Sequence, residues 1–262
     1  MIKVGVIRGG VSGEYEVSLA SGAQVLSHLR SEAMNTKYKP VDIFIDRNGV
    51  WHINGIPTTM DKIIHRVDVI INALHGDYGE DGKVQQELEQ WNIPYTGSGP
   101  FASAVGYNKV LTKQEFSKLG IKTPRHILFL VDDQENLSAQ KKAHYVWDRL
   151  PPPWIVKPLT GGSSIGVHFC KTFQSLVDAL EEDVNGHVSM LVEEVIKGKE
   201  ATVGVINNFR GKDVYTLPPI EIRIPNTSLF FDKDIKYIRQ NQYDMTLVFI
   251  GYQQKRSYVF ND

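Results

Sequence analysis

A glycine- and serine-rich segment at residues 156–167, V-K-P-L-T-G-G-S-S-I-G-V, has the composition of an anion-binding loop. Gly161 and Gly162 have no Cβ to block the approach of a ligand, and the segment offers backbone N–H groups and two serine hydroxyls. Lys157 directly precedes the loop and adds a positive charge, as the lysine of a P-loop does, although the G-x-x-x-x-G-K-[ST] pattern is absent. These residue types predict a phosphate site, and a tight turn with solvated serines is the alternative interpretation of this segment alone.

A second candidate site lies near the start of the chain. Residues 3–7, K-V-G-V-I, predict a short buried strand, and a helical pattern covers residues 18–29. The turn between them, R-G-G-V-S-G-E-Y-E, contains Glu14 and Glu16 but lacks the G-x-G-x-x-G dinucleotide fingerprint. A carboxylate at the carboxyl end of a strand faces the crevice where open α/β sheets bind ligands, whereas an acid in the first turn of a helix is also favoured by the helix dipole. We predict a ligand contact for Glu14 and leave Glu16 open between the two roles.

A third glycine-rich loop, H-G-D-Y-G-E-D-G at residues 75–82, is expected to lie beside the loop that contains Glu14, because both loops follow the carboxyl end of a strand. It follows a predicted buried strand at residues 67–74 and precedes a predicted helix at residues 83–91. A single histidine is more often structural than functional. His75, however, stands where a strand ends and a glycine loop begins, so we predict that it faces a ligand.

The remaining elements place these loops in an α/β chain with three predicted domains. The first domain boundary is expected in the glycine- and proline-containing segment at residues 93–100, and the predicted domains are 1–97, 98–194 and 195–262. The glycine-serine loop is predicted at the tip of a hairpin, because strand character resumes at 167–171. Further strands are expected at 40–45, 50–53, 124–131, 189–194, 201–206 and 217–224, and further helices at 102–119 with a break near Asn108, at 135–148 and at 173–182.

The unit at residues 102–206 combines a lysine-bearing strand with the predicted phosphate loop, so a nucleotide is expected beside it. Adenine would lie near residues 193–196, where a strand end can offer backbone N–H and C=O groups, and a carboxylate such as Glu200 would suit the ribose hydroxyls. Exposed acids are also common at strand ends. Each of these residues, taken singly, is therefore either a ligand contact or an ordinary exposed side chain.

The composition is that of an ordinary globular protein. The 262 residues are 42% apolar and 23% charged, and the net charge of −1 gives no reason to expect a nucleic-acid or anionic-membrane partner. The single cysteine, Cys170, excludes an intramolecular disulfide and is expected to be a packed thiol in a reducing compartment. No segment reaches the length of a membrane span, and a cytoplasmic location is expected.

The motifs resemble, in order and spacing, those of the D-alanine:D-alanine ligases of the ATP-grasp superfamily. The resemblance covers about residues 1–237. It rests on G-G-V-S-G-E-Y-E-V-S-L (9–19), A-L-H-G-D-Y-G-E-D-G (73–82), Y-T-G-S-G (95–99), N-K (108–109), V-K-P…G-S-S-I-G-V (156–167) and L-V-E-E (191–194). It implies an ATP-grasp fold of mixed α/β (α+β) class, with an N-terminal Rossmann-like domain that has a parallel sheet.

The resemblance also implies roles for individual residues. Glu14 would receive the ammonium group of the first D-alanine, His75 would lie near its carboxylate, and Ser163 and Tyr237 would be linked to Glu14 by hydrogen bonds. Lys109, Lys157 and Lys236 would contact ATP phosphates, together with the loop residues Gly162, Ser163 and Ser164. Glu193, Glu194 and Ile196 would frame the adenine, and Glu200 would bind the ribose.

The implied reaction serves peptidoglycan precursor synthesis, and hence the cell wall and cell shape, and has two steps. A D-alanine carboxylate attacks the γ-phosphoryl group of ATP, and the amine of a second D-alanine then displaces phosphate from the acylphosphate. Lysines and Mg²⁺ would neutralise the charge on the transferring group. The segment at 228–237 would close over the site and exclude water, with Tyr237 typical of dipeptide-forming members. The resemblance further suggests a homodimer, with D-alanine and ATP as small-molecule substrates.

The family pattern stops after Tyr237. The Arg-x-Asp and Glu-x-Asn strands that supply magnesium ligands in the family are not found in residues 238–262, where Asp244 and Asp262 are the only acids. We therefore expect an incomplete last domain, unidentified metal ligands, and weak or no turnover, and we interpret the chain as a truncated or frame-altered ligase.

Two other functions stay open at this stage. One is an inactive nucleotide-binding ATP-grasp relative that lacks the metal site. The other is an ATP-grasp carboxylate-amine ligase with a different acceptor, against which Glu14, His75 and Tyr237 together argue.

Overall fold

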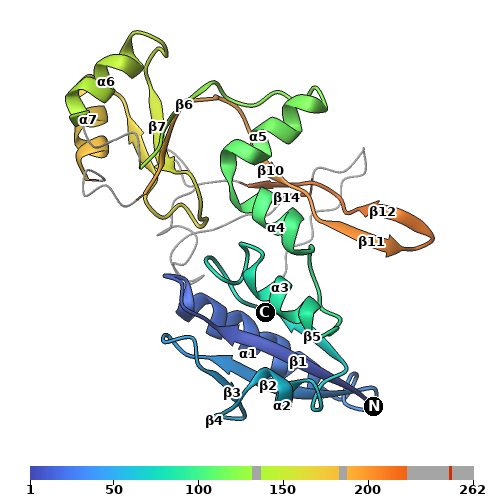
Figure 1. Ribbon diagram of the computed structural model, residues 1–262. Coiled ribbons are helices and arrows are strands. Elements are labelled where there is room, and N and C mark those ends of the chain that lie inside the picture. The colour runs from blue at the N-terminus through green and yellow to red at the C-terminus, as the bar shows by residue number, and fades with distance from the viewer. Residues whose placement is uncertain (132–136, 183–187, 223–247, 250–262) are drawn as a thin grey trace. The chain divides into compact units, whose positions relative to one another are not determined.

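The computed structural model (Figure 1) describes residues 1–131, 137–182, 188–222 and 248–249. Internal contacts divide the chain into two compact units. The first unit comprises Met1–Thr123 and Leu159–Gly162, and the second comprises Pro124–Pro158 and Ser163–Asp262. The three-domain division expected from the sequence stays a prediction.

The first unit contains a five-stranded sheet with the strand order β4-β3-β2-β1-β5. The three strands β2, β1 and β5 run parallel, whereas β3 and β4 return antiparallel beside β2. The expected strands near the start of the chain and the short returning strand after residue 49 are thereby confirmed. The bounds are β1 (Ile2–Gly9), β2 (Tyr38–Ile45), β3 (Trp51–Ile53), β4 (Ile56–Pro57) and β5 (Val69–Asn72).

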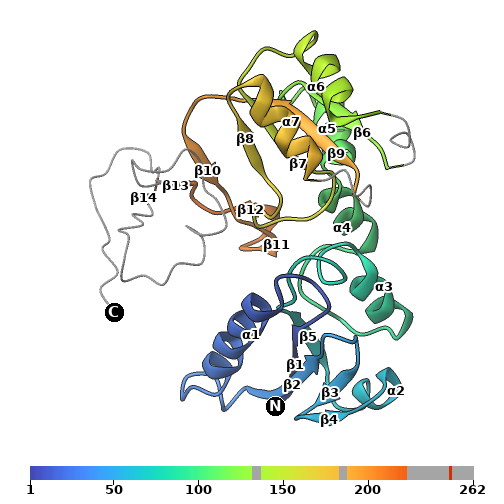
Figure 2. The ribbon, with the colours of Figure 1, turned by 90° about the vertical axis from the view of Figure 1, so that its left-hand side faces the viewer.

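Helices cover both faces of this sheet, as Figure 2 shows. Side chains alternate along a strand, so Val4 and Val6 of β1 point to one face and pack with Leu26 of α1, while Ile7 points to the other face and packs with Val84 of α3. Burying one such side chain contributes about 1.5–3 kcal/mol. The covering helices are α1 (Tyr15–Leu29), α2 (Met60–Ile63) and α3 (Lys83–Gln90).

The two loops singled out in the sequence meet at the carboxyl edge of this sheet. β1 ends at Gly9 and its parallel neighbour β5 ends at Asn72. The buried Ser18 of α1 joins the two strand ends, because its Oγ accepts a hydrogen bond from Gly9 N (2.8 Å) and donates one to Ala73 O (2.8 Å). This edge is where ligands bind in open α/β sheets.

A broken helix follows the sheet. Asn108 ends α4 (Pro100–Tyr107) and begins α5 (Lys109–Lys118), and its side chain accepts hydrogen bonds from Val110 N and Leu111 N. Asparagine at this position satisfies two N–H groups that the first turn of a helix leaves without partners. The predicted break near Asn108 is confirmed.

The second unit contains a four-stranded antiparallel sheet with the order β6-β9-β7-β8. The predicted hairpin around the glycine-serine loop is confirmed, because β7 pairs with β8. Helices α6 and α7 pack on this sheet over a core that includes Trp154, Val146 and Leu176 (Figures 1 and 2). The bounds are β6 (His126–Phe129), β7 (Trp154–Pro158), β8 (His168–Cys170), β9 (Met190–Glu194), α6 (Ala139–Trp147) and α7 (Phe173–Glu181).

The prediction of a single strand at residues 201–206 is wrong, because two strands share these residues. The chain leaves β10 after Thr202 and starts β11 at Val205, and Gly204 O accepts a hydrogen bond from Leu217 N (2.8 Å) next to the pairing of β11 with β12. The two strands belong to different sheets, in the orders β10-β13-β14 and β11-β12. The bounds are β10 (Glu200–Thr202), β11 (Val205–Phe209), β12 (Lys212–Thr216), β13 (Ile220–Ile222) and β14 (Val248–Phe249).

Replacement of Ser18 by alanine tests the junction at the carboxyl edge of the first sheet. Ser18→Ala leaves Gly9 N–H and Ala73 O without their hydroxyl partner, so the free energy of unfolding is expected to fall by about 1–3 kcal/mol. Urea denaturation measures this change. Ser27→Ala, at an exposed serine of the same helix, is the control and should change the free energy of unfolding by less than about 0.5 kcal/mol. Equal effects of the two variants would contradict the prediction.

Candidate functional site

Glu14 lies at the end of the loop that follows β1, and it is only 6% exposed. The loop is tied to the one after β5 through Ser12. Ser12 Oγ donates a hydrogen bond to His75 O (2.6 Å) and accepts one from Glu14 N (3.1 Å). The sequence prediction that Glu14 and His75 lie on neighbouring loops is therefore confirmed.

Gly76 allows the second loop to pass close to the Glu14 carboxylate. Its φ angle is +70°, and a Cβ at this position would lie 3.1 Å from Glu14 Oε2 and 3.0 Å from Ser12 Cβ. A larger residue would meet both backbone strain and crowding here. The glycine keeps the His75 backbone beside a buried acid.

The His75 ring is held at both nitrogens. Ser21 Oγ of α1 lies 2.9 Å from Nε2, and Glu80 Oε1 lies 3.4 Å from Nδ1. The hydrogen bond with Glu80 raises the pKa of His75, and the negative charges of Glu80 and Glu14 act in the same direction against the effect of burial. The result is a cation-forming group and a buried carboxylate on adjoining loops, a combination that suits the carboxylate and ammonium groups of an amino acid.

The tip of the glycine-serine loop contacts Lys109. Lys109 Nζ donates a hydrogen bond to Gly161 O (2.9 Å), and Lys109 N donates one to Leu159 O (3.1 Å). Gly161 has a φ angle of +91°, and the φ angles of Ser163 and Ser164 are +52° and +56°. Non-glycine residues in this region cost roughly 1–3 kcal/mol each and concentrate at ligand-binding sites.

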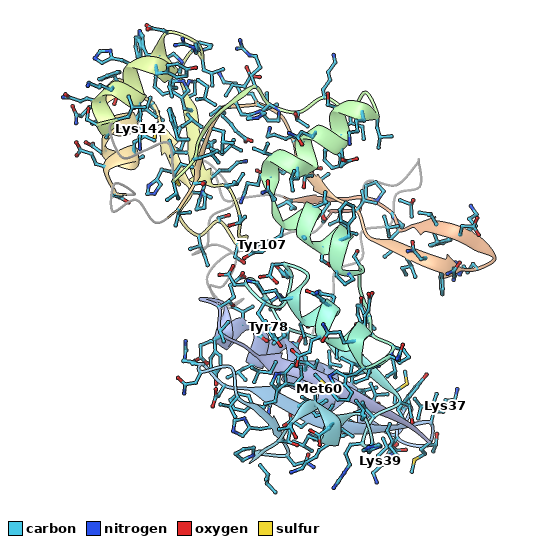
Figure 3. All side chains as sticks on the ribbon, viewed as in Figure 1. Lys37, Lys39, Met60, Tyr78, Tyr107 and Lys142 are labelled. Atoms are coloured by element: carbon cyan, nitrogen blue, oxygen red, sulfur yellow. The ribbon has the colours of Figure 1, made fainter. Side chains whose placement is uncertain are left out.

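The loop at residues 75–82 also approaches the tip of the glycine-serine loop within the first unit. Tyr107, labelled at the end of α4 in Figure 3, donates a hydrogen bond from its OH group to Asp77 Oδ1 (2.8 Å), and burial together with this bond raises the pKa of Tyr107. A Cβ on Gly161 would lie 3.9 Å from the Tyr107 hydroxyl oxygen, and one on Gly162 would lie 4.0 Å from Glu80 Oε2.

Sequence reasoning missed four residues of this arrangement. Asp77 and Glu80 stood inside a loop already singled out for its acids, but nothing in the pattern gave them separate roles. Tyr107 and Ser21 lie within helical segments, where periodicity alone gives no sign of contact with a distant loop.

The second unit brings two other predicted site residues together. Lys157 of β7 forms an ion pair with Glu193 of β9, with 2.5 Å between Nζ and Oε2. The neighbouring strands place the pair, because Ile155 stands opposite Glu193 and Lys157 opposite Leu191. The two residues expected to contact phosphate and adenine thus neutralise each other in this structure.

The other predicted nucleotide residues of this unit lie at the end of β9 and along the chain that follows it. Glu194 accepts hydrogen bonds from Arg125 N (2.8 Å) and Arg125 Nε (2.9 Å). Ile196 is 65% exposed, and Glu200 begins the exposed strand β10. Lys236 and Tyr237 lie outside the described residues.

No group of three or more His, Cys, Asp or Glu side chains able to hold a metal ion occurs in the part of the chain that the structure describes. Cys170 is buried, and burial raises the pKa of its thiol to about 11, as expected for a packed thiol of low reactivity. Within the described ranges, no helix is both long and apolar enough to cross a membrane.

Two protein-family models match the chain. The model described as D-ala D-ala ligase N-terminus matches residues 3–66 and 55–98, and that described as D-ala D-ala ligase C-terminus matches residues 116–257. The second match continues 20 residues beyond Tyr237, the last residue of the motifs found in the sequence.

Individual relatives show the same similarity. The D-alanine–D-alanine ligase of Fervidobacterium nodosum is 34% identical over 242 residues, which are 89% of this chain and 70% of the relative. That of Carboxydothermus hydrogenoformans is 37% identical over 236 residues, 90% of this chain and 69% of the relative. A crystal structure of the Bacillus anthracis D-alanine–D-alanine ligase complexed with ATP is 32% identical, with a TM-score of 0.66, and the match covers 86% of this chain and 67% of that one. The chain spans about 70% of the length of the first two relatives.

Substitution of Glu80 tests the electrostatics around His75. Glu80→Gln removes the principal cause of the raised pKa of His75, so this pKa should fall toward its ordinary value of 6.5. A histidine pKa raised by folding adds stability that is complete below the unfolded-state pKa and is lost as the pH rises through the folded-state pKa. Relative to the unaltered chain, Glu80→Gln should therefore lower the free energy of unfolding more at pH 5.5 than at pH 9.

Two measurements check this prediction. NMR titration of the His75 ring gives its pKa, and urea denaturation at the two pH values gives the stability difference. Glu115→Gln, at an exposed acid of α5, serves as the control. An unchanged His75 pKa in Glu80→Gln would contradict the prediction.

Proposed function

The chain belongs to the D-alanine–D-alanine ligase family, and we propose that it joins two molecules of D-alanine with ATP to give D-alanyl-D-alanine for peptidoglycan precursor synthesis. The observation that best supports this function lies in the first unit. There, Glu14 and His75 stand on adjoining loops, and Lys109 contacts the tip of a glycine-serine loop. Glu14 and His75 suit the charged groups of an amino acid, and Lys109 with the glycine-serine loop suits a phosphate.

In this proposal Glu14 receives the ammonium group of the first D-alanine, and His75 faces its carboxylate. The protonated His75 ring attracts the carboxylate, and the raised pKa of His75 increases the protonated fraction at a given pH. The buried position of Glu14 strengthens its attraction to an ammonium group, because charges interact more strongly away from water. Ser163 and Tyr237 are proposed to share hydrogen bonds with Glu14, on the strength of the family resemblance alone.

ATP phosphates are proposed to bind at Lys109, Lys157 and Lys236. In the unit that contains it, Lys157 pairs with Glu193, so a phosphate would compete with this carboxylate for the ammonium group. In the same way, a phosphate would compete with Gly161 O for Lys109. Gly162, Ser163 and Ser164 would add loop contacts, while Glu193, Glu194 and Ile196 would frame the adenine and Glu200 would bind the ribose.

The proposed chemistry has two balanced steps. A carboxylate oxygen of the first D-alanine forms a bond to the γ-phosphorus of ATP as the bond to the ADP oxygen breaks, giving an acylphosphate and ADP. The deprotonated amine of the second D-alanine then attacks the acyl carbon, the bond from that carbon to the phosphate oxygen breaks, and inorganic phosphate leaves with the proton that the amine nitrogen gives up. The lysines act by neutralising the charge of the transferring group, which is the main contribution of proteins to phosphoryl transfer.

Three further properties are proposed from the family resemblance. Mg²⁺ would enter with ATP and supply positive charge beside the phosphates. A homodimer and a cytoplasmic location are also proposed, the latter in keeping with a free, buried Cys170. Sedimentation velocity on the purified chain measures the oligomeric state.

The proposed function is tested by the release of ADP and D-alanyl-D-alanine from ATP, Mg²⁺ and D-alanine. We expect D-alanine-dependent release of both products by the 262-residue chain, at the low rate that the sequence predicts. Lys157→Ala should lower this rate by at least about 100-fold, because the loss of one group that stabilises a transition-state anion has that effect in other enzymes. Lys141→Ala, at an exposed lysine of α6, is the control and should leave the rate unchanged.

Two outcomes would contradict the proposed function. Equal turnover by Lys157→Ala and the unaltered chain would exclude the proposed role of Lys157. A folded chain that binds ATP but releases no ADP would favour the nucleotide-binding relative without ligase activity.

A further inference from the structure

Helix α1 holds the loop after β5 through two serines three residues apart. Residues separated by three positions lie on the same face of a helix. Ser18 Oγ donates to Ala73 O, the first backbone carbonyl after β5, and Ser21 Oγ lies 2.9 Å from Nε2 of His75. Ser18 therefore fixes the backbone of the loop, and Ser21 contacts the one side chain of the loop that is expected to face substrate.

The protonation of the His75 ring follows from its two neighbours. A carboxylate only accepts hydrogen bonds, so the nitrogen that faces Glu80, Nδ1, carries a proton in the bonded state. The other nitrogen, Nε2, accepts a hydrogen bond when the ring is neutral and donates one when the ring is protonated. A serine hydroxyl can serve as donor or acceptor, so Ser21 can bond to Nε2 in both states.

We propose that Ser21 is a positioning residue of the ligase reaction, which holds the His75 ring at Nε2 so that its charge faces the carboxylate of the first D-alanine. This inference rests on the proposed function for the identity of the ligand. The charged groups that face His75 are Glu80 and Glu14, which lie on the two loops at the end of the sheet. Ser21 adds no charge, and its contribution is the orientation of the ring.

The geometry distinguishes Ser21 from Glu80. Glu80 changes the charge of the ring, whereas Ser21 restricts its rotation from the opposite side. Outer partners of a functional histidine commonly fix its ring orientation in this way. Without Ser21 the ring keeps one hydrogen bond at a longer distance of 3.4 Å, about which it can turn away from the substrate.

The test uses the full chain with three substitutions at one position. Ser21→Ala removes the hydroxyl, Ser21→Cys keeps the size with a much weaker hydrogen-bonding group, and Ser21→Thr restores a hydroxyl. Ser27→Ala is the matched control on an exposed position of the same helix. NMR of the His75 ring nitrogens reports protonation and tautomer, and steady-state kinetics give KM for D-alanine, KM for ATP and kcat.

The expected result is a selective loss of D-alanine affinity. Ser21→Ala and Ser21→Cys should raise KM for D-alanine about 2- to 10-fold, the factor that corresponds to one lost hydrogen bond, while KM for ATP stays constant. Both variants should shift the Nε2 resonance of His75, and Ser21→Thr should restore both quantities. A purely structural role would instead lower the melting temperature and change both KM values together.

The results separate this inference from the proposed function. An unchanged Nε2 resonance in folded Ser21→Ala or Ser21→Cys would overturn the positioning role, whatever the activity of the chain. If the unaltered chain shows no turnover, D-alanine binding measured by calorimetry replaces KM. A chain that gives the expected His75 spectra in all variants but binds no D-alanine would overturn the proposed ligand, and with it the functional part of the Ser21 role.

Discussion

The junction between the carboxyl ends of β1 and β5 is the constraint on which the proposed amino-acid site depends. Parallel strands end at the same edge of a sheet, but their loops adopt a common arrangement only if the buried polar groups there find partners. Ser18 satisfies a donor in the last residue of β1 and an acceptor after β5, and Ser12 makes a similar connection further along the two loops. Glu14 and His75 are thereby fixed on adjoining loops that follow the directly paired strands β1 and β5.

Glu80 connects this junction with the glycine-serine loop. One of its carboxylate oxygens faces Nδ1 of His75, and the other lies next to Gly162. The same acid thus sets the charge of the group proposed to bind an amino acid and borders the loop proposed to bind a phosphate. Tyr107 and Asp77 form a second connection between the same two loops. The arrangement gives a physical reason for the acids in H-G-D-Y-G-E-D-G, since two of them have separate contacts.

Two of the lysines that are proposed to bind phosphate already have partners within their own units. Lys157 pairs with Glu193, and Lys109 donates to Gly161 O. Such pairing keeps ammonium groups from lying partly buried without a partner, which would be costly. A bound phosphate would replace Glu193 as the partner of Lys157 and Gly161 O as the partner of Lys109. The gain in affinity from each lysine is therefore the difference in free energy between its contact with phosphate and its present contact.

Sequence patterns alone predict the parallel N-terminal sheet, the hairpin around the glycine-serine loop, the break at Asn108 and the family, because hydrophobic periodicity, turn residues and motif spacing are local properties of the chain. The folded structure was needed to find that Ser21 and Glu80 hold His75, that Tyr107 contacts Asp77, and that Lys157 pairs with Glu193. It also divided the expected strand at 201–206 between two sheets, with Gly204 O bonded to the distant Leu217 N. These contacts join residues from different elements, and the packing of helices and the register of strands that bring them together depend on the whole chain.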